Sequence, residues 1–62
     1  MSTQVVIEDY GHKEWAVYVV SDGYQFTKTR YRKYAEALKR VSAYLDYYQV
    51  AQATEIMFPF QY

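Results

Sequence analysis

The sequence contains no cysteine, one proline, two glycines and one histidine. Without cysteine the protein has neither disulfides nor thiolate metal ligands, and nothing in the sequence calls for an oxidising compartment. The longest apolar run, Trp15 to Val20, is too short to cross a bilayer, and Met1 to Gln4 lack the basic region of a signal peptide. We therefore expect a cytoplasmic protein that is neither secreted nor inserted in a membrane.

Length and composition predict one folded domain over residues 1–62. A single hydrophobic core needs most of a 62-residue chain to close, so a second domain is excluded. Disorder is excluded too, because 52% of the residues are hydrophobic. Domains of this size bury only about 60% of the surface of the unfolded chain, so staples or self-association often support them.

Four segments have the residue patterns of β-strands. The first two are apolar on both faces, which is typical of central strands, and the dipeptide Asp22-Gly23 after the second suits a tight hairpin turn. Pro59 follows the fourth segment and would end it. The predicted strands lie at about residues 4–10, 14–21, 24–28 and 53–58.

Apolar residues between the third and fourth strands recur at helical spacing, with no interrupting glycine or proline. The predicted helix covers about residues 30–48, with the hydroxyl of Thr29 as its N-terminal cap. Its apolar stripe comprises Tyr31, Tyr34, Ala35, Leu38, Val41, Leu45 and Tyr48. We expect Leu38, Val41 and Leu45 to pack onto the sheet.

These elements predict an α+β fold in the order β-β-β-α-β, a small mixed sheet with one amphipathic helix on one face. The helix crosses over the first two strands and puts the last strand beside the first, which gives the sheet order 3-2-1-4. Trp15 and Val17 would face the helix, whereas Ala16, Tyr18 and Val20 would lie on the open face. We expect a second copy in a homodimer, or another partner, to cover that face; the alternative is a shallow, wet tyrosine face.

The charges are unevenly distributed although the net charge is zero. Residues 28–40 hold six of the seven basic residues and one acidic residue, Glu36, which gives this segment a net charge of +5 and the remainder −5. The six are Lys28, Arg30, Arg32, Lys33, Lys39 and Arg40. A positive helix start suits phosphate groups or an acidic protein surface, because the helix dipole is already positive there. The alternative is a solvated helix face on which Glu36 pairs with Lys39 and Arg40.

A second stripe runs along the predicted helix, away from the apolar one. It comprises Lys33, Ala37, Arg40, Tyr44 and Tyr47, at steps of four, three, four and three residues. Nine tyrosines contribute to an aromatic content of 21%, so some rings must lie at the surface, where tyrosine is favoured for binding. The predicted partner-binding residues are Lys33, Arg40, Tyr44, Tyr47 and Tyr18.

Signals for catalysis are poor. His12 is the single histidine, and Asp9 and Glu14 across the first turn could orient it as a base or join it as weak metal ligands. No nucleophile partner, glycine-rich phosphate loop or second histidine supports that interpretation. We expect no enzymatic activity, no cofactor and no metal site.

The first functional hypothesis is a non-catalytic protein-interaction module that acts by steric occlusion. In its small size and tyrosine-rich surface the chain resembles phage-encoded inhibitors of host systems, without matching residues. That resemblance implies an inhibitor or accessory protein of phage or bacterial type. The alternative is a nucleic-acid-binding domain that uses the basic segment 28–40. A pI near 6.5 favours the protein partner, because nucleic-acid binders usually carry a basic excess.

Overall fold

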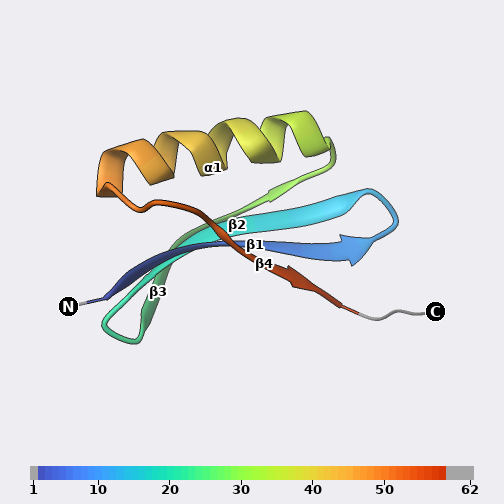
Figure 1. Cartoon of the computed structure of the whole chain (residues 1–62). Coiled ribbons are helices and arrows are strands. Elements are labelled where there is room, and N and C mark those ends of the chain that lie inside the picture. Colours follow the sequence, from blue (N-terminus) through green and yellow to red (C-terminus); the bar gives the residue numbers. More distant parts are fainter. Residues whose placement is uncertain (1, 59–62) are drawn as a thin grey trace.

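The chain forms four strands and one helix in the order β-β-β-α-β (Figure 1). The computed structural model describes residues 2–58. Its elements are β1 (Thr3–Gly11), β2 (Glu14–Ser21), β3 (Tyr24–Tyr31), α1 (Tyr34–Tyr48) and β4 (Thr54–Met57). The predicted order of elements is confirmed, whereas Pro59, expected to end the last strand, lies outside the described residues.

The strands form one mixed sheet in the order β3-β2-β1-β4, so the predicted sheet order and the α+β class are confirmed. β1 pairs antiparallel with β2 and parallel with β4. Parallel neighbours cannot be joined by a tight turn, and α1 provides the crossover from β3 at one edge to β4 at the other (Figure 1). Asp22 and Gly23 have φ angles of 52° and 86° and form the predicted turn between β2 and β3.

The third strand is longer than predicted and the helix begins later, because β3 extends to Tyr31. Thr29 and Tyr31 continue the antiparallel pairing with β2. A bulge near Thr27, whose φ is 60°, absorbs one extra residue of β3 and keeps the strand paired beyond it. The expected cap at Thr29 is therefore wrong; Lys33 occupies the N-cap position and makes no side-chain cap.

The hydrophobic core lies between α1 and one face of the sheet. Its buried members are Val5, Ile7, Val17, Ala37 and Val41. Trp15 and Leu45 pack against them, half-buried, so the expected contributions of Trp15, Val17, Val41 and Leu45 are confirmed. Among the described residues, the backbone of α1 lies close to β1, β2 and β3 but not to β4. The described residues include no helix that is both long enough and apolar enough to cross a membrane.

The helix is rotated about its axis relative to the prediction. Ala37, expected on the outward stripe, is fully buried, and Leu38, expected at the centre of the core, is 42% exposed. The small side chain of Ala37 lets the helix backbone approach the sheet, so Ala37 and Val41 make the central contact. Leu38 then lies to one side of this contact and stays outside the core.

Candidate functional site

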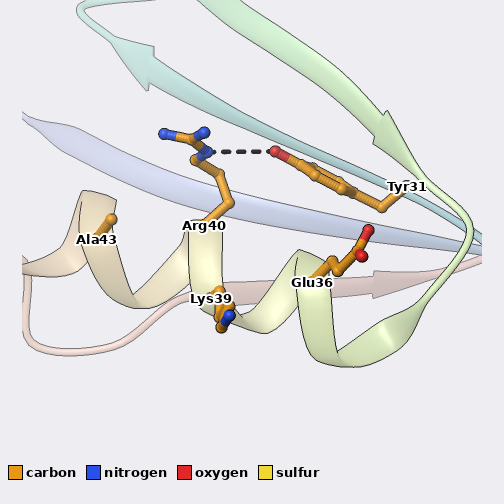
Figure 2. Close-up of a pocket in the computed structure, with 5 residues that line it drawn as sticks. All are labelled: Tyr31, Glu36, Lys39, Arg40 and Ala43. Atoms are coloured by element: carbon orange, nitrogen blue, oxygen red, sulfur yellow. Dashed lines mark hydrogen bonds between the residues drawn. The ribbon is translucent and has the colours of Figure 1, made fainter.

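Two adjoining hollows run along the flank of α1 that faces β3. The first has a volume of about 410 Å³ and is lined by Tyr31, Glu36, Lys39, Arg40 and Ala43 (Figure 2). The second has a volume of about 330 Å³ and is lined by Arg40, Ala43, Tyr44, Tyr47 and Tyr48. Because both include Arg40 and Ala43, they form one surface feature, called the helix groove below.

Helical periodicity explains why these side chains share one flank. Residues three and four apart lie on the same side of a helix, which places Glu36, Arg40, Ala43 and Tyr47 along one line. Tyr31 closes the first hollow from the end of β3 (Figure 2). The small side chain of Ala43 leaves a low floor between larger neighbours, so the two hollows meet there.

Arg40 is held in place from two sides. Its Nε donates a hydrogen bond of 3.2 Å to the hydroxyl of Tyr31 (Figure 2), and its Cζ lies 5.6 Å from the centroid of the Tyr44 ring. The hydrogen bond to Tyr31 raises the pKa of the Arg40 guanidinium, which therefore stays charged. No carboxylate of the described residues lies within ion-pair distance of Arg40. In the described part of the chain, the groove therefore contains an oriented positive charge that no ion pair neutralises.

Aromatic rings line the other end of the groove. Tyr48 contacts two of them, with centroid distances of 4.8 Å to Tyr47 and 6.1 Å to Tyr44. It also contacts Phe26 of β3, which lines neither hollow, at 6.4 Å. Tyr44 also packs against the core. Tyr47 stands edge-on to Tyr48 and keeps 78% of its surface exposed. The helix groove thus presents one exposed ring that rests on a packed cluster.

Three of the five predicted partner-binding residues line the helix groove: Arg40, Tyr44 and Tyr47. Lys33 lies at the N-cap position of α1 and lines neither hollow. Tyr31 and Tyr48 also line the groove although their spacing in the sequence assigns both to the apolar stripe of one long helix. Tyr31 belongs to β3 instead, and no local pattern could have shown that it meets a helix residue nine positions later.

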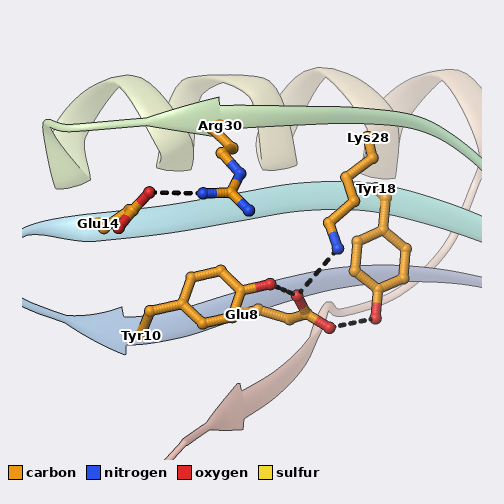
Figure 3. Close-up of polar contacts among 6 residues, drawn as sticks. All are labelled: Glu8, Tyr10, Glu14, Tyr18, Lys28 and Arg30. Atoms are coloured by element: carbon orange, nitrogen blue, oxygen red, sulfur yellow. Dashed lines mark hydrogen bonds and ion pairs between the residues drawn. The ribbon is translucent and has the colours of Figure 1, made fainter. Parts of the chain in front are cut away.

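The face of the sheet away from α1 carries a polar cluster around Glu8 (Figure 3). The hydroxyls of Tyr10 and Tyr18 donate to the two carboxylate oxygens of Glu8, the bond from Tyr18 being 2.7 Å, and Nζ of Lys28 lies 3.6 Å from Oε1. Lys28 also lies over the Tyr18 ring, 5.3 Å from its centroid. Tyr18 is only 6% exposed as a result, so the expectation of an open Tyr18 surface is wrong.

The pKa values in this cluster follow from its contacts. Burial raises the pKa of Glu8, but the hydrogen bonds from Tyr10 and Tyr18 and the charge of Lys28 outweigh it and hold that pKa below its usual value. Burial and the hydrogen bond to Glu8 raise the pKa of Tyr18 to about 12. The cluster therefore pairs an ionised carboxylate with neutral phenols at neutral pH.

The predicted phosphate-binding residues do not share one surface. Lys28 pairs with Glu8, and Nη1 of Arg30 lies 2.7 Å from Oε2 of Glu14, both on the face shown in Figure 3. The remaining four lie elsewhere: Arg32 and Lys33 precede α1, and Lys39 and Arg40 lie on it. The six cations are therefore divided between separate parts of the fold, and two of them are already paired with carboxylates.

The turn between β1 and β2 contains His12, which is exposed and has a φ of 52°. The carboxylate of Asp9 accepts a hydrogen bond of 2.9 Å from the backbone N–H of Gly11, and so stabilises the turn itself. In the part of the chain that the structure describes, no group of three or more histidine, cysteine, aspartate or glutamate residues could hold a metal ion.

The strongest binding chemistry on the described surface is therefore the helix groove, with one oriented guanidinium and one exposed ring on a packed aromatic base. Its residues come from β3 and α1, and their arrangement depends on the bulge in β3 and on the rotation of the helix. Comparison with models of protein families, with curated proteins and with solved structures gives no match for this chain.

Proposed function

We propose that the protein is a non-catalytic interaction module that binds another protein through the helix groove. The observation that supports this most directly is Tyr47, which is 78% exposed on a regular helix and rests on the ring of Tyr48. Tyrosine is a poorer helix former than alanine or lysine, so folding alone does not account for it at an exposed helical position. Partner binding does account for it.

A tyrosine side chain loses little conformational freedom when a partner covers it. Its ring has few rotamers, offers a large contact area and carries a hydroxyl that tolerates water. In the helix groove, Tyr48 already restricts the Tyr47 ring, which reduces the entropy that binding costs. Tyrosines and arginines in such positions contribute most of the free energy of many protein interfaces.

The mechanism that fits a 62-residue chain is steric occlusion, in which the module covers a surface that its partner needs. That the protein is an inhibitor or accessory factor of phage or bacterial type stays a prediction. Nucleic-acid binding stays the alternative, and the division of the six cations between separate parts of the fold weighs against it.

A pair of tyrosine variants tests the proposal. A partner captured from a cell lysate would be purified, and its affinity measured for the wild type, Tyr47→Ala and Tyr24→Ala. Tyr24 is the matched control, because it is 77% exposed but lies at the β2–β3 turn and lines neither hollow. We expect Tyr47→Ala to weaken binding by about 2 kcal/mol, roughly thirtyfold, with little change in Tm.

Equal affinities for the wild type and Tyr47→Ala would remove the helix groove as the binding surface. If Tyr47→Ala and Tyr24→Ala weakened the affinity for the partner equally, the loss would come from removing any exposed tyrosine and would not identify the helix groove. A nucleic-acid partner would reveal itself by an affinity that falls steeply with salt, whereas contact through a tyrosine ring should persist at moderate salt.

A further inference from the structure

We propose that Arg40 is a prearranged receptor for a carboxylate, and that the partner segment entering the helix groove presents an aspartate or glutamate side chain to it. This inference rests on the proposed function, since it names the chemistry of the partner at the same groove.

The geometry of Arg40 is the first reason. Tyr31 accepts the hydrogen bond from Nε, so the two terminal nitrogens of the guanidinium remain available as a fork (Figure 2). Two parallel hydrogen bonds from such a fork match the two oxygens of a carboxylate. No described residue occupies the fork. The contacts that fix Arg40 therefore leave its ligand-binding edge open.

The second reason is that the group accepting the hydrogen bond from Arg40, the hydroxyl of Tyr31, is neutral. Tyr31 orients Arg40 without cancelling its charge, whereas Arg30, on the other face of the sheet, is neutralised by Glu14 at 2.7 Å. A free arginine side chain would lose rotational freedom when it binds a carboxylate. In the helix groove the contacts with Tyr31 and Tyr44 have already removed much of that freedom. The protein thus keeps a full charge in a fixed orientation.

The charge of the first hollow favours a carboxylate over a phosphate. Lys39 and Arg40 line it together with one acid, Glu36, so its lining carries a net charge of +1. A single carboxylate matches that balance. A phosphate monoester carries close to two negative charges at neutral pH and would meet stronger repulsion from Glu36. The ligand chemistry is therefore a monoanion with two equivalent oxygens.

The second hollow indicates what lies next to the carboxylate. It shares Arg40 and Ala43 with the first hollow and is otherwise lined by the rings of Tyr44, Tyr47 and Tyr48. An apolar or aromatic side chain beside the acidic residue would fill it and cover the exposed Tyr47 ring. The partner segment that fits the helix groove thus has an acidic residue followed or preceded by an apolar one.

The test uses the isotope-labelled 62-residue chain and a defined probe, the blocked dipeptide N-acetyl-Asp-Phe-amide. Its binding would be followed by NMR through the Nε–H resonance of Arg40 and the backbone amides of residues 39–48. We expect saturable shifts with this peptide, and about tenfold weaker binding of the matched N-acetyl-Asn-Phe-amide, which lacks the charge.

Three variants make the assignment specific. Arg40→Gln should abolish the preference for the aspartyl peptide, and Glu36→Gln should strengthen binding because it removes a like charge from the hollow. Arg30→Gln is the matched control, an arginine on the opposite face that should leave binding unchanged. Backbone spectra of each variant would verify that the fold is intact.

Absence of saturable shifts, equal binding of the two peptides, or unchanged binding by Arg40→Gln would overturn the inference. So would tighter binding of a phosphoserine peptide than of the aspartyl peptide. The two proposals fail separately. If Tyr47→Ala loses the captured partner but Arg40→Gln retains it, the carboxylate site is wrong and the proposed function stands. If the wild type binds the aspartyl peptide through Arg40 but Tyr47→Ala still binds the captured partner, the proposed function is wrong and the carboxylate site stands.

Discussion

Replacing Glu8 by glutamine should destabilise the protein at neutral pH although it preserves the shape of the side chain. Glu8 is only 8% exposed, and its carboxylate accepts hydrogen bonds from the hydroxyls of Tyr10 and Tyr18 near the ammonium group of Lys28 (Figure 3). Glutamine has one acceptor oxygen, and its NH2 group would face a hydroxyl or Lys28 instead of a charged oxygen. At least one tyrosine therefore loses its acceptor.

The magnitude follows from the charged state of the acceptor. A hydrogen bond to a charged group contributes roughly 1.5–3 kcal/mol, and a neutral one about 1 kcal/mol. Since glutamine can keep one neutral bond in place of two charged ones, the difference is about 2–5 kcal/mol, and we expect Glu8→Gln to lower the unfolding free energy by the lower end of that range, about 2 kcal/mol. For a domain of this size that corresponds to a decrease in Tm of about 10 °C.

Urea unfolding followed by Trp15 fluorescence, repeated across pH, would separate charge from packing. The pKa of Glu8 is below its ordinary value of 4.5 in the fold, so the stabilisation is complete above that pH and is lost as the pH falls through the folded pKa. The stability gap between wild type and Glu8→Gln should therefore close in acid. Glu14→Gln, which breaks the exposed pair with Arg30, should cost less than about 1 kcal/mol. A gap that persists unchanged in acid would refute the electrostatic account.

The fold was predictable from sequence because its strongest signals are local. Asp22-Gly23 has the backbone freedom that its turn requires, and the apolar alternation on both faces of β2 marks a central strand. A single helix between the third and fourth strands left one simple crossover, which gives the observed sheet order. The predicted boundary between β3 and α1 was wrong because pairing with β2 holds Thr29 and Tyr31 in the sheet.

The face of the helix could not be predicted from spacing alone. Ala37 and Leu38 are adjacent, and either can lie at the edge of a helical stripe centred on Val41. Residue size favours leucine in the core, but the approach of the helix backbone to the sheet favours alanine, and the structure buries Ala37. That rotation moves Tyr44 toward the core and leaves Tyr47 exposed.

The cluster around Glu8 was missed for a different reason. Glu8 pairs with Ala16 across β1 and β2, and this register brings Tyr18 beside it. The pairing of β3 with β2 then brings Lys28 to the same carboxylate. A sequence shows alternation along a strand but not which residues of two strands are neighbours. The burial of Tyr18 also removes the reason for expecting a homodimer through that ring. Self-association stays a prediction, which sedimentation at micromolar concentration would test.

Two further predictions concern stability. The pKa of Tyr18 is raised to about 12 from 10.0, so its protonated hydroxyl stabilises the fold below about pH 10 and loses that effect between pH 10 and 12, which urea unfolding in alkaline buffer would show. Replacing Leu38 by alanine should cost at most about 1 kcal/mol, because the side chain is 42% exposed. Val41→Ala should cost about 2 kcal/mol, because Val41 is buried beside Ala37 and the change leaves a cavity. If urea midpoints ranked Leu38→Ala as the more damaging change, α1 would pack through the face that the sequence spacing favours, and the positions of Arg40 and Tyr47 in the helix groove would be wrong.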